Sequence, residues 1–304
     1  MKKKICVVTG GAGFVGSHLV ERLVDLGHKV IVLDNLSSGK IQNLKKIKKK
    51  IKFFKIDLSK KKNIEKYFKN VNWIFHLAGV SSVTQSILHP IKYYLNNVQS
   101  TINLLNAIKY QKIEKMIFFS TAALYGNPKK LPINENSKIQ ILNNYSFSKK
   151  ICEEILEHWW KVFKTNIVIL RVFNVYGSRC KDTPGDGNVV GIFYKKFLQK
   201  KTFMVYGNGK QTRDFIYIAD VLDALIKLAK SKIKFDIFNL GSGKQTSIND
   251  LVKTIGVKKF KYLPKNKHEI ENSIACIKKL KKSIGWVPLT KIEKGIKKTF
   301  NSLI

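Results

Sequence analysis

Residues 4–16, KICVVTGGAGFVG, decide the fold of this 304-residue chain. A short β-branched run ends in glycines, and residues 14–30, FVGSHLVERLVDLGHKV, place apolar side chains at helical spacing. Gly10, Gly13 and Gly16 therefore stand between an expected strand and an expected helix. Glycines in this position let the backbone approach a pyrophosphate, which then lies at the positive end of the helix dipole. The context predicts a dinucleotide site, and a glycine-rich turn without a ligand is the alternative.

Strands and helices alternate along the first 170 residues or so. Further buried strands are expected in residues 29–35, 51–57, 72–79, 115–121 and 166–174. A long helix is expected in residues 86–110 and another in residues 145–164. This alternation predicts right-handed crossovers and a doubly wound parallel sheet of the Rossmann type. We expect residues 1–175 to form this domain, joined by a strand near 235–240, and residues 176–304 to form mainly a smaller α/β lobe.

Lysine dominates the charged residues, with 53 lysines and four arginines against 20 acids, for a net charge of +37. Apolar residues make up 44% of the chain, which is typical of a folded protein. A basic surface attracts any polyanion, but arginine dominates specific contacts to bases and is scarce here. A lysine-rich solvated surface is therefore the simpler interpretation, and nucleic acid is not favoured as the main partner.

The cysteines and the apolar runs predict the compartment. Four cysteines lie far apart without a CxxC pair, which is typical of a reducing compartment and fits neither a disulfide framework nor a zinc site. No apolar run approaches the roughly 18 residues that a membrane helix needs. The opening MKKKICVVTGGAGF reaches glycines too early for a signal peptide. We expect a cytoplasmic protein without a membrane segment and without a metal site.

Asp34 ends the second expected strand, 18 residues after Gly16. This spacing is close to the ~20 residues expected for the acid that binds the adenosine ribose diol. A carboxylate there repels a 2′-phosphate, so NAD is favoured over NADP. A turn aspartate before Asn35 explains the residue equally well if it is taken alone. Asp57 ends the third strand, where it could contact the adenine edge or cap the next segment.

Tyr145 and Lys149 stand one helical turn apart, so the ammonium can lie near the phenol and favour its phenolate. The pattern YxxxK begins at Tyr125, Tyr145 and Tyr206. Tyr145 is singled out because it opens a strong helix and follows the strand at 115–121 at a loop-length spacing. That strand ends with Ser120 and Thr121 at the carboxyl edge of the expected sheet, where ligands bind.

Eight segments, in this order and spacing, resemble the extended short-chain dehydrogenase/reductase family. The segments are TGGAGFVGSHL, VLDNLSSG, FHLAG, YYLNNV, FSTAALYG, YSFSK, RVFNVYG and YGNGKQTRDFIYIAD, and the match covers about residues 4–300. Within the family the chain is most similar to the NAD-dependent epimerase/dehydratase enzymes that act as UDP-glucose or UDP-N-acetylglucosamine 4-epimerases. The resemblance implies a homodimer with NAD on the Rossmann sheet and a nucleotide sugar on the lobe of residues 176–304.

The resemblance also implies roles for individual residues. Thr121, Tyr145 and Lys149 match catalytic positions. Cofactor contacts match Gly10, Gly13, Phe14, Val15, Gly16, Asp34, Asn35, Asp57, Leu58, Leu77, Ala78, Gly79, Asn97, Tyr145 and Lys149. Substrate contacts match Thr121, Asn174, Asn188, Val189, Tyr206, Arg213 and Ser273. Arginine also suits such a position physically, because its bidentate fork matches a pyrophosphate.

The activity that the resemblance implies is 4-epimerisation of a UDP-hexose or UDP-N-acetylhexosamine through a transient 4-keto sugar. Tyr145 would take the hydroxyl proton once Lys149 and oxidised nicotinamide lower its pKa from the usual ~10. Related dehydratases and decarboxylases place an acid just after the catalytic threonine, where this chain has Ala122 and Ala123. These two enzyme classes are the alternative, and a non-catalytic NAD-binding or polyanion-binding protein is an alternative of another kind.

Three positions depart from what this family usually carries. Asn266 stands where an arginine commonly clamps a phosphate, with Lys265 or Lys267 as replacement charges. Asn144, and not the frequent proline, precedes Tyr145. Ser273 stands where epimerases restricted to glucose and galactose carry a tyrosine, so it predicts room for an N-acetyl group. The alternative for Ser273 is a small residue in a shifted loop.

Overall fold

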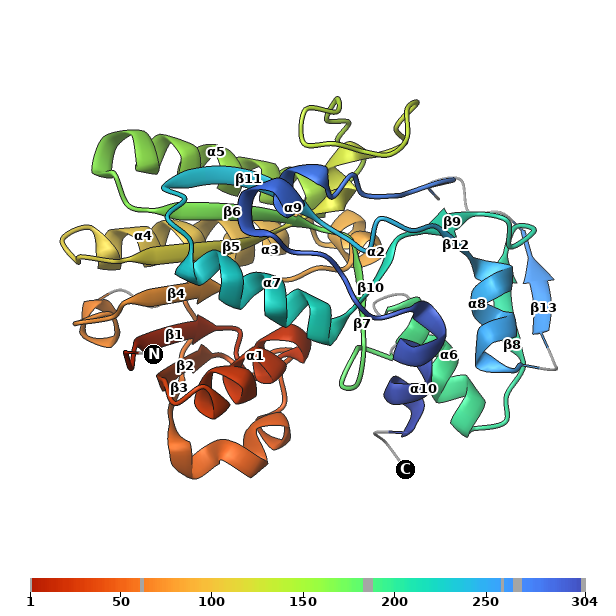
Figure 1. Cartoon of the computed structure of the whole chain (residues 1–304), viewed down its shortest axis with the longest axis horizontal. Helices are drawn as coiled ribbons and strands as arrows, with labels where there is room; N and C mark the ends of the chain where they lie inside the picture. Colours follow the sequence, from red (N-terminus) through yellow and green to blue (C-terminus); the bar gives the residue numbers. More distant parts are fainter. Residues whose placement is uncertain (1, 61–62, 183–187, 258–259, 265–269, 302–304) are drawn as a thin grey trace. The chain divides into compact units, whose positions relative to one another are not determined.

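The structure is a computed structural model that describes residues 2–60, 63–182, 188–257, 260–264 and 270–301 (Figure 1). The chain forms two compact units. Unit 1 consists of Met1–Thr121, Asn143–Leu170 and Ala224–Phe238. Unit 2 consists of Ala122–Leu142, Arg171–Asp223 and Asn239–Ile304. Among the helices of the described ranges, none has the length and apolar character needed to cross a membrane.

A seven-stranded sheet with the order β11-β6-β5-β4-β1-β2-β3 forms the centre of unit 1 (Figure 1). Its strands are β1 (Ile5–Thr9), β2 (Lys29–Asp34), β3 (Ile51–Lys55), β4 (Trp73–His76), β5 (Lys115–Thr121), β6 (Ile167–Val172) and β11 (Phe235–Leu240). The pairs from β5 to β3 are all parallel. The strand order reverses at β1, and in doubly wound sheets a ligand binds at this switch point. The strand expected near residues 235–240 lies in this sheet.

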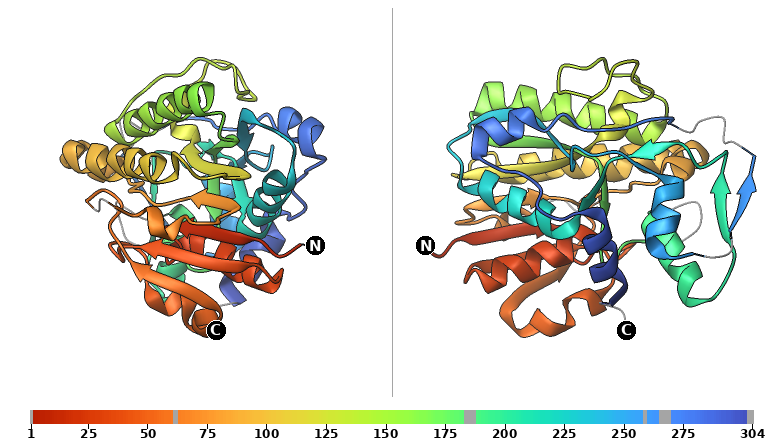
Figure 2. Two further views of the ribbon diagram at one scale, coloured as in Figure 1. Left: turned by 90° about the vertical axis from the view of Figure 1, so that its left-hand side faces the viewer. Right: turned by 45° about the vertical axis from the view of Figure 1, so that its right-hand side comes forward.

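Helices cover both faces of the sheet (Figure 2). On one face lie α4 (Ser100–Ile108) and α5 (Asn144–Phe163), and on the other α1 (Phe14–Asp25) and α7 (Ile218–Lys230). Val7 of β1 belongs to the apolar cluster of α4 and α5, whereas its neighbours Cys6 and Val8 are fully buried on the opposite side. Because both faces are covered, the central strands β1 and β4 are buried along nearly their whole length, whereas β3 at the edge of the sheet is largely exposed. The predicted Rossmann-type fold is confirmed.

The segment between β4 and α4 differs from the single helix that its apolar spacing predicts. It consists of α2 (Val83–Leu88), α3 (Pro90–Tyr93) and the π-helix η3 (Tyr94–Gln99), which runs into α4. Pro90 has no N–H to donate, so it can only begin a new helix. The other short helices of unit 1 are η1 (Ile41–Lys50) and η2 (Glu65–Tyr67).

Unit 2 combines short strand pairs with helices. Its elements are η4 (Ala122–Tyr125), β7 (Asn174–Tyr176), α6 (Val189–Leu198), β8 (Phe203–Tyr206), β9 (Thr212–Arg213), β10 (Phe215–Tyr217), β12 (Thr246–Ser247), α8 (Ile248–Ile255), β13 (Phe260–Leu263), α9 (Lys278–Ile284) and α10 (Ile292–Asn301). Strands β7 and β10, and β8 and β13, pair in parallel, and β9 and β12 pair antiparallel. One apolar core joins α6, α8 and α10 to β7, β8 and β10.

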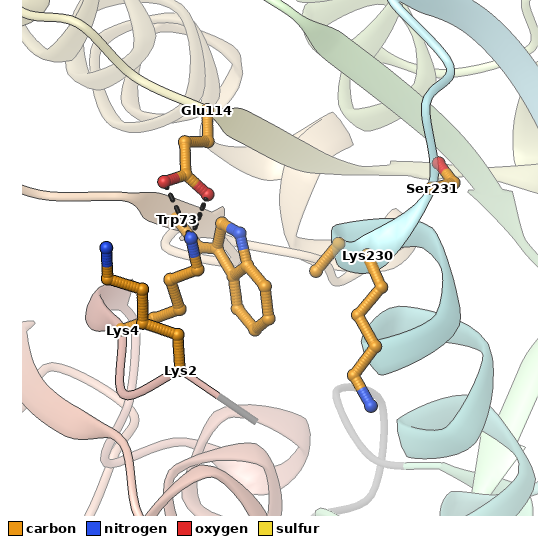
Figure 3. A pocket seen from close by; sticks show the side chains of 7 residues that line it. Lys2, Lys4, Trp73, Glu114, Lys230 and Ser231 are labelled. Carbon is orange, nitrogen blue, oxygen red and sulfur yellow. Dashed lines mark hydrogen bonds and ion pairs between the residues drawn. The ribbon is translucent and has the colours of Figure 1, made fainter.

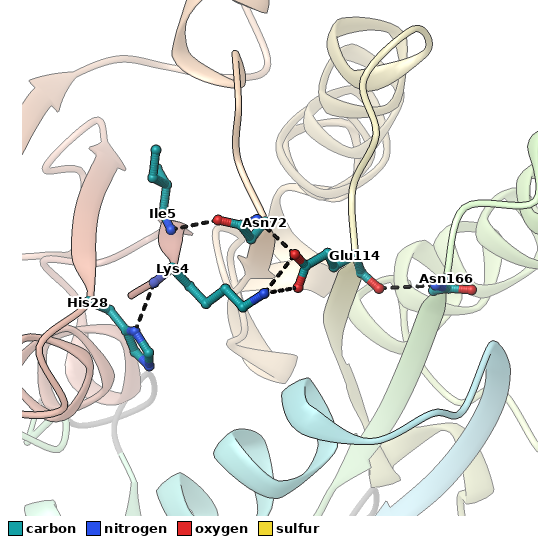
Figure 4. A network of polar contacts seen from close by, with 6 residues as sticks. All are labelled: Lys4, Ile5, His28, Asn72, Glu114 and Asn166. Atoms are coloured by element: carbon teal, nitrogen blue, oxygen red, sulfur yellow. Dashed lines mark hydrogen bonds and ion pairs between the residues drawn. The ribbon is translucent and has the colours of Figure 1, made fainter. Parts of the chain in front are cut away.

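A polar network closes the amino-terminal edge of the unit 1 sheet (Figure 4). Lys4 Nζ donates to both carboxylate oxygens of Glu114 at 2.7 Å, and Asn72 links Glu114 to the backbone N–H of Ile5. A pocket of about 270 Å³ lies beside this network, lined by Lys2, Lys4, Trp73, Glu114, Ala229, Lys230 and Ser231 (Figure 3). Ligands of such sheets bind at the carboxyl edge, so this network serves to anchor the start of β1.

Candidate active site

The turn between β1 and α1 is built by close backbone contacts. Gly10 has a φ of +69°, and a Cβ on this residue would lie 2.8 Å from the Ala78 nitrogen. A Cβ on Gly16 would lie 2.1 Å from the Gly10 carbonyl oxygen. Gly13 is the N-cap of α1 and supplies no side-chain cap. The turn therefore leaves the positive end of α1 without a capping side chain, which is the arrangement that binds an anion.

Asp34 ends β2 and is held by this same turn. Its Oδ2 accepts a hydrogen bond from Ala12 N at 2.9 Å, and its Oδ1 accepts one from Leu36 N at 2.8 Å. Burial raises the pKa of the Asp34 carboxyl, and the two backbone hydrogen bonds oppose the rise. The glycine turn and the acid thus form one rigid cradle. Its glycines, open helix end and fixed carboxylate fit the pyrophosphate and ribose of a dinucleotide.

Asp57 makes local contacts after β3. It accepts hydrogen bonds from Ser59 N at 3.0 Å and Ser59 Oγ at 2.6 Å, and Asn35 also bonds to it. Partial burial works against ionisation, but these hydrogen bonds outweigh it and hold the pKa of Asp57 below its ordinary value. The structure thus shows the capping interaction, and a contact with adenine stays a prediction. Of the other expected cofactor positions, Phe14 and Val15 begin α1, Leu58 is buried, and Leu77 and Ala78 follow β4.

Asn97 connects the loop after β4 to α5. Its Oδ1 accepts from Val80 N at 2.8 Å, and its Nδ2 donates to Val80 O at 3.1 Å and to Ser148 Oγ at 2.9 Å. Gly79 has a φ of +155°, and a Cβ there would lie 2.7 Å from Asn97 Oδ1. Only glycine therefore lets the loop approach Asn97 so closely.

Thr121, Tyr145 and Lys149 lie together at the carboxyl end of β5. The N-cap of α5 is Asn143, which accepts from Ser146 N at 2.9 Å and fixes the first turn that holds Tyr145. The side chain of Thr121, the last residue of β5, hydrogen-bonds Tyr145. Lys149 Nζ donates to the carbonyl oxygen of Phe119, another β5 residue, at 2.7 Å. The structure therefore brings the three expected catalytic residues into one site.

Burial dominates the electrostatics of this site. Burial raises the pKa of Tyr145 to about 12, the hydrogen bond from Thr121 lowers it, and Tyr93 raises it further. Burial also lowers the pKa of Lys149, which Cys152 and Glu153 oppose. In the chain by itself, Lys149 is not among the groups that shift the Tyr145 pKa, and its ammonium donates to a β5 carbonyl. The lowering of this pKa by Lys149 together with oxidised nicotinamide stays a prediction.

The sequence analysis assigned no role to two side chains beside the catalytic positions, Asn144 and Ser148. Asn144 donates from Nδ2 to Ser86 O at 2.9 Å and accepts from the Tyr94 hydroxyl at 2.8 Å. It therefore fixes the start of α5 to α2 and η3, which a proline could not do. Ser148 donates to Tyr145 O at 2.7 Å while it accepts from Asn97. Asn144 directly precedes the YxxxK pattern and Ser148 lies inside it, but only their contacts reveal these roles.

Three of the expected substrate positions gather around Asp214 in unit 2. Asn174 Nδ2 donates to Asp214 O at 3.4 Å, and Arg213 of β9 precedes Asp214 directly. The segment of Ser273 runs beside β9, because Thr212 N donates to Glu271 O at 2.9 Å and Thr212 Oγ1 to Asn272 Oδ1 at 2.8 Å. Ser273 itself is buried.

Asp214 was not anticipated, although it follows Arg213 directly. Its buried carboxylate accepts hydrogen bonds from Ser242 N at 2.6 Å, Gly243 N at 2.9 Å and Ala275 N at 3.0 Å. It therefore joins β9 to the turn after β11 and to the segment that follows Ser273.

The other expected substrate positions lie at the start of α6 and at the end of β8. Asn188 caps α6 by accepting from Val190 N at 2.9 Å, and its Nδ2 donates to Val175 O at 2.5 Å. Its polar atoms thus hold α6 to β7, and Val189 is the first residue of α6. Tyr206 ends β8 with 52% of its surface exposed. Asn266 and its two lysine neighbours lie outside the described residues.

The parallel sheet, the cradle of Gly10 and Asp34, and the buried trio at β5 define a dinucleotide-dependent oxidoreductase site of the short-chain dehydrogenase/reductase kind. Residues 6–241 match the model of the NAD dependent epimerase/dehydratase family. The chain therefore belongs to this family, and the predicted resemblance is confirmed. Among the described residues no group of three or more His, Cys, Asp or Glu is placed to hold a metal ion.

Several relatives are similar over nearly their full length. A UDP-N-acetylglucosamine 4-epimerase of Methanobrevibacter ruminantium, solved with UDP-N-acetylmuramic acid, is 34% identical with a TM-score of 0.94, covering 100% of this chain and 99% of that one. A UDP-glucose 4-epimerase of Thermotoga maritima, solved with UDP-glucose, is 32% identical with a TM-score of 0.93 and 98% coverage of both chains. A UDP-N-acetyl-alpha-D-glucosaminuronate decarboxylase of Bacillus cytotoxicus is 33% identical over 98% of this chain and 97% of its own.

Proposed function

We propose that the chain is an NAD-dependent 4-epimerase of UDP-hexoses or UDP-N-acetylhexosamines that works through a transient 4-keto sugar. The observation that supports this most is the hydrogen-bonded pair of Thr121 and Tyr145 at the sheet edge that also holds the glycine cradle. Two related enzymes of known structure are UDP-sugar 4-epimerases, and both match nearly all of this chain.

Three side chains have roles in the reaction at carbon 4 in this proposal. Bound NAD would supply the hydride acceptor and donor for carbon 4 of the sugar. The phenolate oxygen of Tyr145 takes the proton of the 4-hydroxyl and gives it back after the sugar has turned. Thr121 hydrogen-bonds the 4-oxygen throughout. Lys149, bonded to the Phe119 carbonyl, holds a positive charge beside the site.

Binding roles follow from the geometry of each unit. In unit 1, Gly10, Gly13 and Gly16 would hold the pyrophosphate of NAD and Asp34 its adenosine ribose. Asn97 fixes the loop of Gly79 beside the cofactor. Phe14, Val15, Asn35, Asp57, Leu58, Leu77 and Ala78 complete the proposed cofactor contacts. In unit 2, the proposed UDP-sugar contacts are Asn174, Asn188, Val189, Tyr206, Arg213 and Ser273.

Decarboxylation or dehydration of a nucleotide sugar is the second candidate, because one relative that is 33% identical to this chain is a decarboxylase. Both reactions need a further acid or base after the oxidation. The residues after Thr121 are Ala122 and Ala123, whose methyl groups cannot transfer a proton. This pair of residues favours epimerisation.

One experiment separates these candidates. The purified protein is denatured gently and its released cofactor identified by mass spectrometry, and intact protein is incubated with UDP-glucose, UDP-N-acetylglucosamine and UDP-glucuronic acid. We expect the released cofactor to be NAD, and we expect a UDP-sugar to be converted to its 4-epimer, which has the same mass. Loss of carbon dioxide or water from a substrate would support the second candidate. If the protein releases no cofactor and converts no substrate, the result would support a non-catalytic protein.

A homodimer in the cytoplasm completes the proposal. Leu88, Ile91 and Leu95 are 63%, 65% and 54% exposed along α2, α3 and η3, and Phe147 of α5 is also exposed. Apolar side chains of this number on neighbouring helices favour burial against a second copy. The four cysteines are all free thiols, which fits a reducing compartment. Light scattering of wild type and of Leu95→Lys tests the dimer, and we expect only the variant to be monomeric.

A further inference from the structure

The ammonium of Lys149 is buried without a direct carboxylate partner. The residue is 5% exposed, and its Nζ donates to Phe119 O and lies 4.6 Å from the centre of the Phe118 ring. A carbonyl and an aromatic face stabilise a cation, but neither neutralises it. A buried charge is costly unless an opposite charge balances it. An opposite charge near Lys149 would therefore oppose the lowering of its pKa by burial and keep the ammonium protonated.

Among the titratable groups that face Lys149, one remains as a source of this opposite charge. His76 of β4 is held neutral, because burial and the charge of Lys149 lower its pKa to about 3. In the chain by itself, burial raises the pKa of the Cys152 thiol and of the Tyr145 phenol, so neither is negative there at neutral pH. Glu153 is the carboxyl group among these neighbours, and it acts on Lys149 in the direction that keeps the ammonium protonated.

Glu153 also contacts the strand that carries Thr121. It lies on α5 one turn after Lys149, and only 1% of its surface is exposed. The Ser120 hydroxyl donates to its Oε1 at 2.5 Å. Ser120 directly precedes Thr121 in β5. One buried carboxylate is therefore bonded to the end of β5 and placed one helical turn from the ammonium.

We propose that Glu153 is a positioning residue of the active site, whose carboxylate balances the Lys149 ammonium and, through Ser120, fixes the strand end that bears Thr121. This inference rests on the proposed epimerase function for its kinetic test. In this proposal Glu153 acts through Lys149 and Ser120 and does not touch the substrate.

The kinetic test compares pH profiles of kcat for four variants. Glu153→Gln removes the charge and keeps the shape, so we expect the alkaline limb to move down by about one pH unit. Glu153→Asp and Ser120→Ala keep the charge, so their alkaline limbs should match wild type while kcat falls. Glu154→Gln is the matched control, because this exposed neighbour pairs only at the surface with Lys150 at 3.4 Å. An unshifted limb in Glu153→Gln overturns the proposal.

A stability measurement tests the charge balance without any activity. We expect Glu153→Gln to lower the melting temperature more in wild type than in a Lys149→Met background, because only wild type then holds an unbalanced ammonium. If Glu153→Gln alone does not fold, recovery of folding in the double variant is the supporting result. Equal losses in both backgrounds, or an unfolded double variant, contradict the proposal. An inactive wild type, by contrast, contradicts the proposed function and leaves this measurement valid.

Discussion

Asn97 and Ser148 lie on different helices, and the Nδ2 atom of Asn97 donates to Ser148 Oγ at 2.9 Å. Asn97 also holds Val80 of the loop after β4, and Ser148 donates to the backbone of Tyr145. The loop beside the cofactor cradle and the turn of the expected catalytic tyrosine are thus joined through two side chains. A change in this loop should therefore reach Tyr145 as well as the cofactor.

Gly79→Ala tests this connection. The new Cβ would lie 2.7 Å from Asn97 Oδ1 at a φ of +155°, so Asn97 must move. We expect a loss of about 1–3 kcal/mol in unfolding free energy, together with weaker NAD binding by calorimetry. Gly27→Ala is the control, since it has a positive φ but no atom within 4 Å of the new Cβ. The connection is refuted if both variants bind NAD as wild type does.

Tyr145→Phe should keep NAD and lose turnover. The change removes only the phenolic oxygen, which in the proposed mechanism carries the proton, so we expect a loss of about 10²–10⁴-fold in kcat. Tyr93→Phe removes a phenol whose ring lies 6.3 Å from that of Tyr145 and should have a much smaller effect. Epimerisation is followed by chromatography of the UDP-sugars. Wild-type rates in Tyr145→Phe would exclude this residue as the acid and base.

His76 makes the stability of the chain dependent on pH. Its pKa is lowered from 6.5 to about 3 by burial and by Lys149, so the folded state binds fewer protons than the unfolded state between these values. The resulting stability is complete above pH 6.5 and is lost as the pH falls towards 3, at up to about 1.4 kcal/mol per pH unit. Urea unfolding between pH 7 and 5 measures this slope. In His76→Gln this slope should fall by the amount that corresponds to nearly one bound proton. Curves of unfolding free energy against pH that run parallel in wild type and variant would contradict the assignment.

Ser273→Tyr tests which sugars fit. The buried Ser273 side chain lies in a segment bonded to β9, and a phenol there would take up the space proposed for an N-acetyl group. We expect wild type and Ser273→Ala to epimerise UDP-N-acetylglucosamine, and Ser273→Tyr to lose this activity while keeping that on UDP-glucose. Melting curves of all three proteins control for misfolding. A wild type that ignores N-acetyl sugars would show that the pocket argument is wrong.

The sequence was sufficient for the sheet and its cradle because their signals are local. Gly10 and Gly16 are required by backbone contacts within or next to one turn, and Asp34 is bonded to Ala12 in that same turn. The apolar strands reveal their burial on both faces directly. The placing of Tyr145 and Lys149 at the end of β5 followed from the order of strands and helices.

Other features depend on contacts between distant segments. Ser120 and Glu153 are 33 residues apart, and neither belongs to a motif that marks a buried pair. The bond of Lys149 to Phe119 O depends on how α5 packs on β5. Helical spacing alone could therefore predict only that the Lys149 ammonium lies near the Tyr145 phenol. Asp214 likewise receives its donors from residues 242, 243 and 275, which only folding brings together.

The π-helix η3 is a place where this stretch of the chain can change its length by one residue. A π turn holds one residue more than an α turn, so it absorbs the rotation of about 100° that an additional residue would cause in a regular α-helix. Within Tyr94–Gln99, Leu95 is exposed and Asn97 is buried, and Leu104 of the following α4 is buried as well. Deleting one residue from this wide turn should therefore give a regular helix whose two ends keep their faces. A deletion of one residue within α4 should instead rotate Leu104 away from the core.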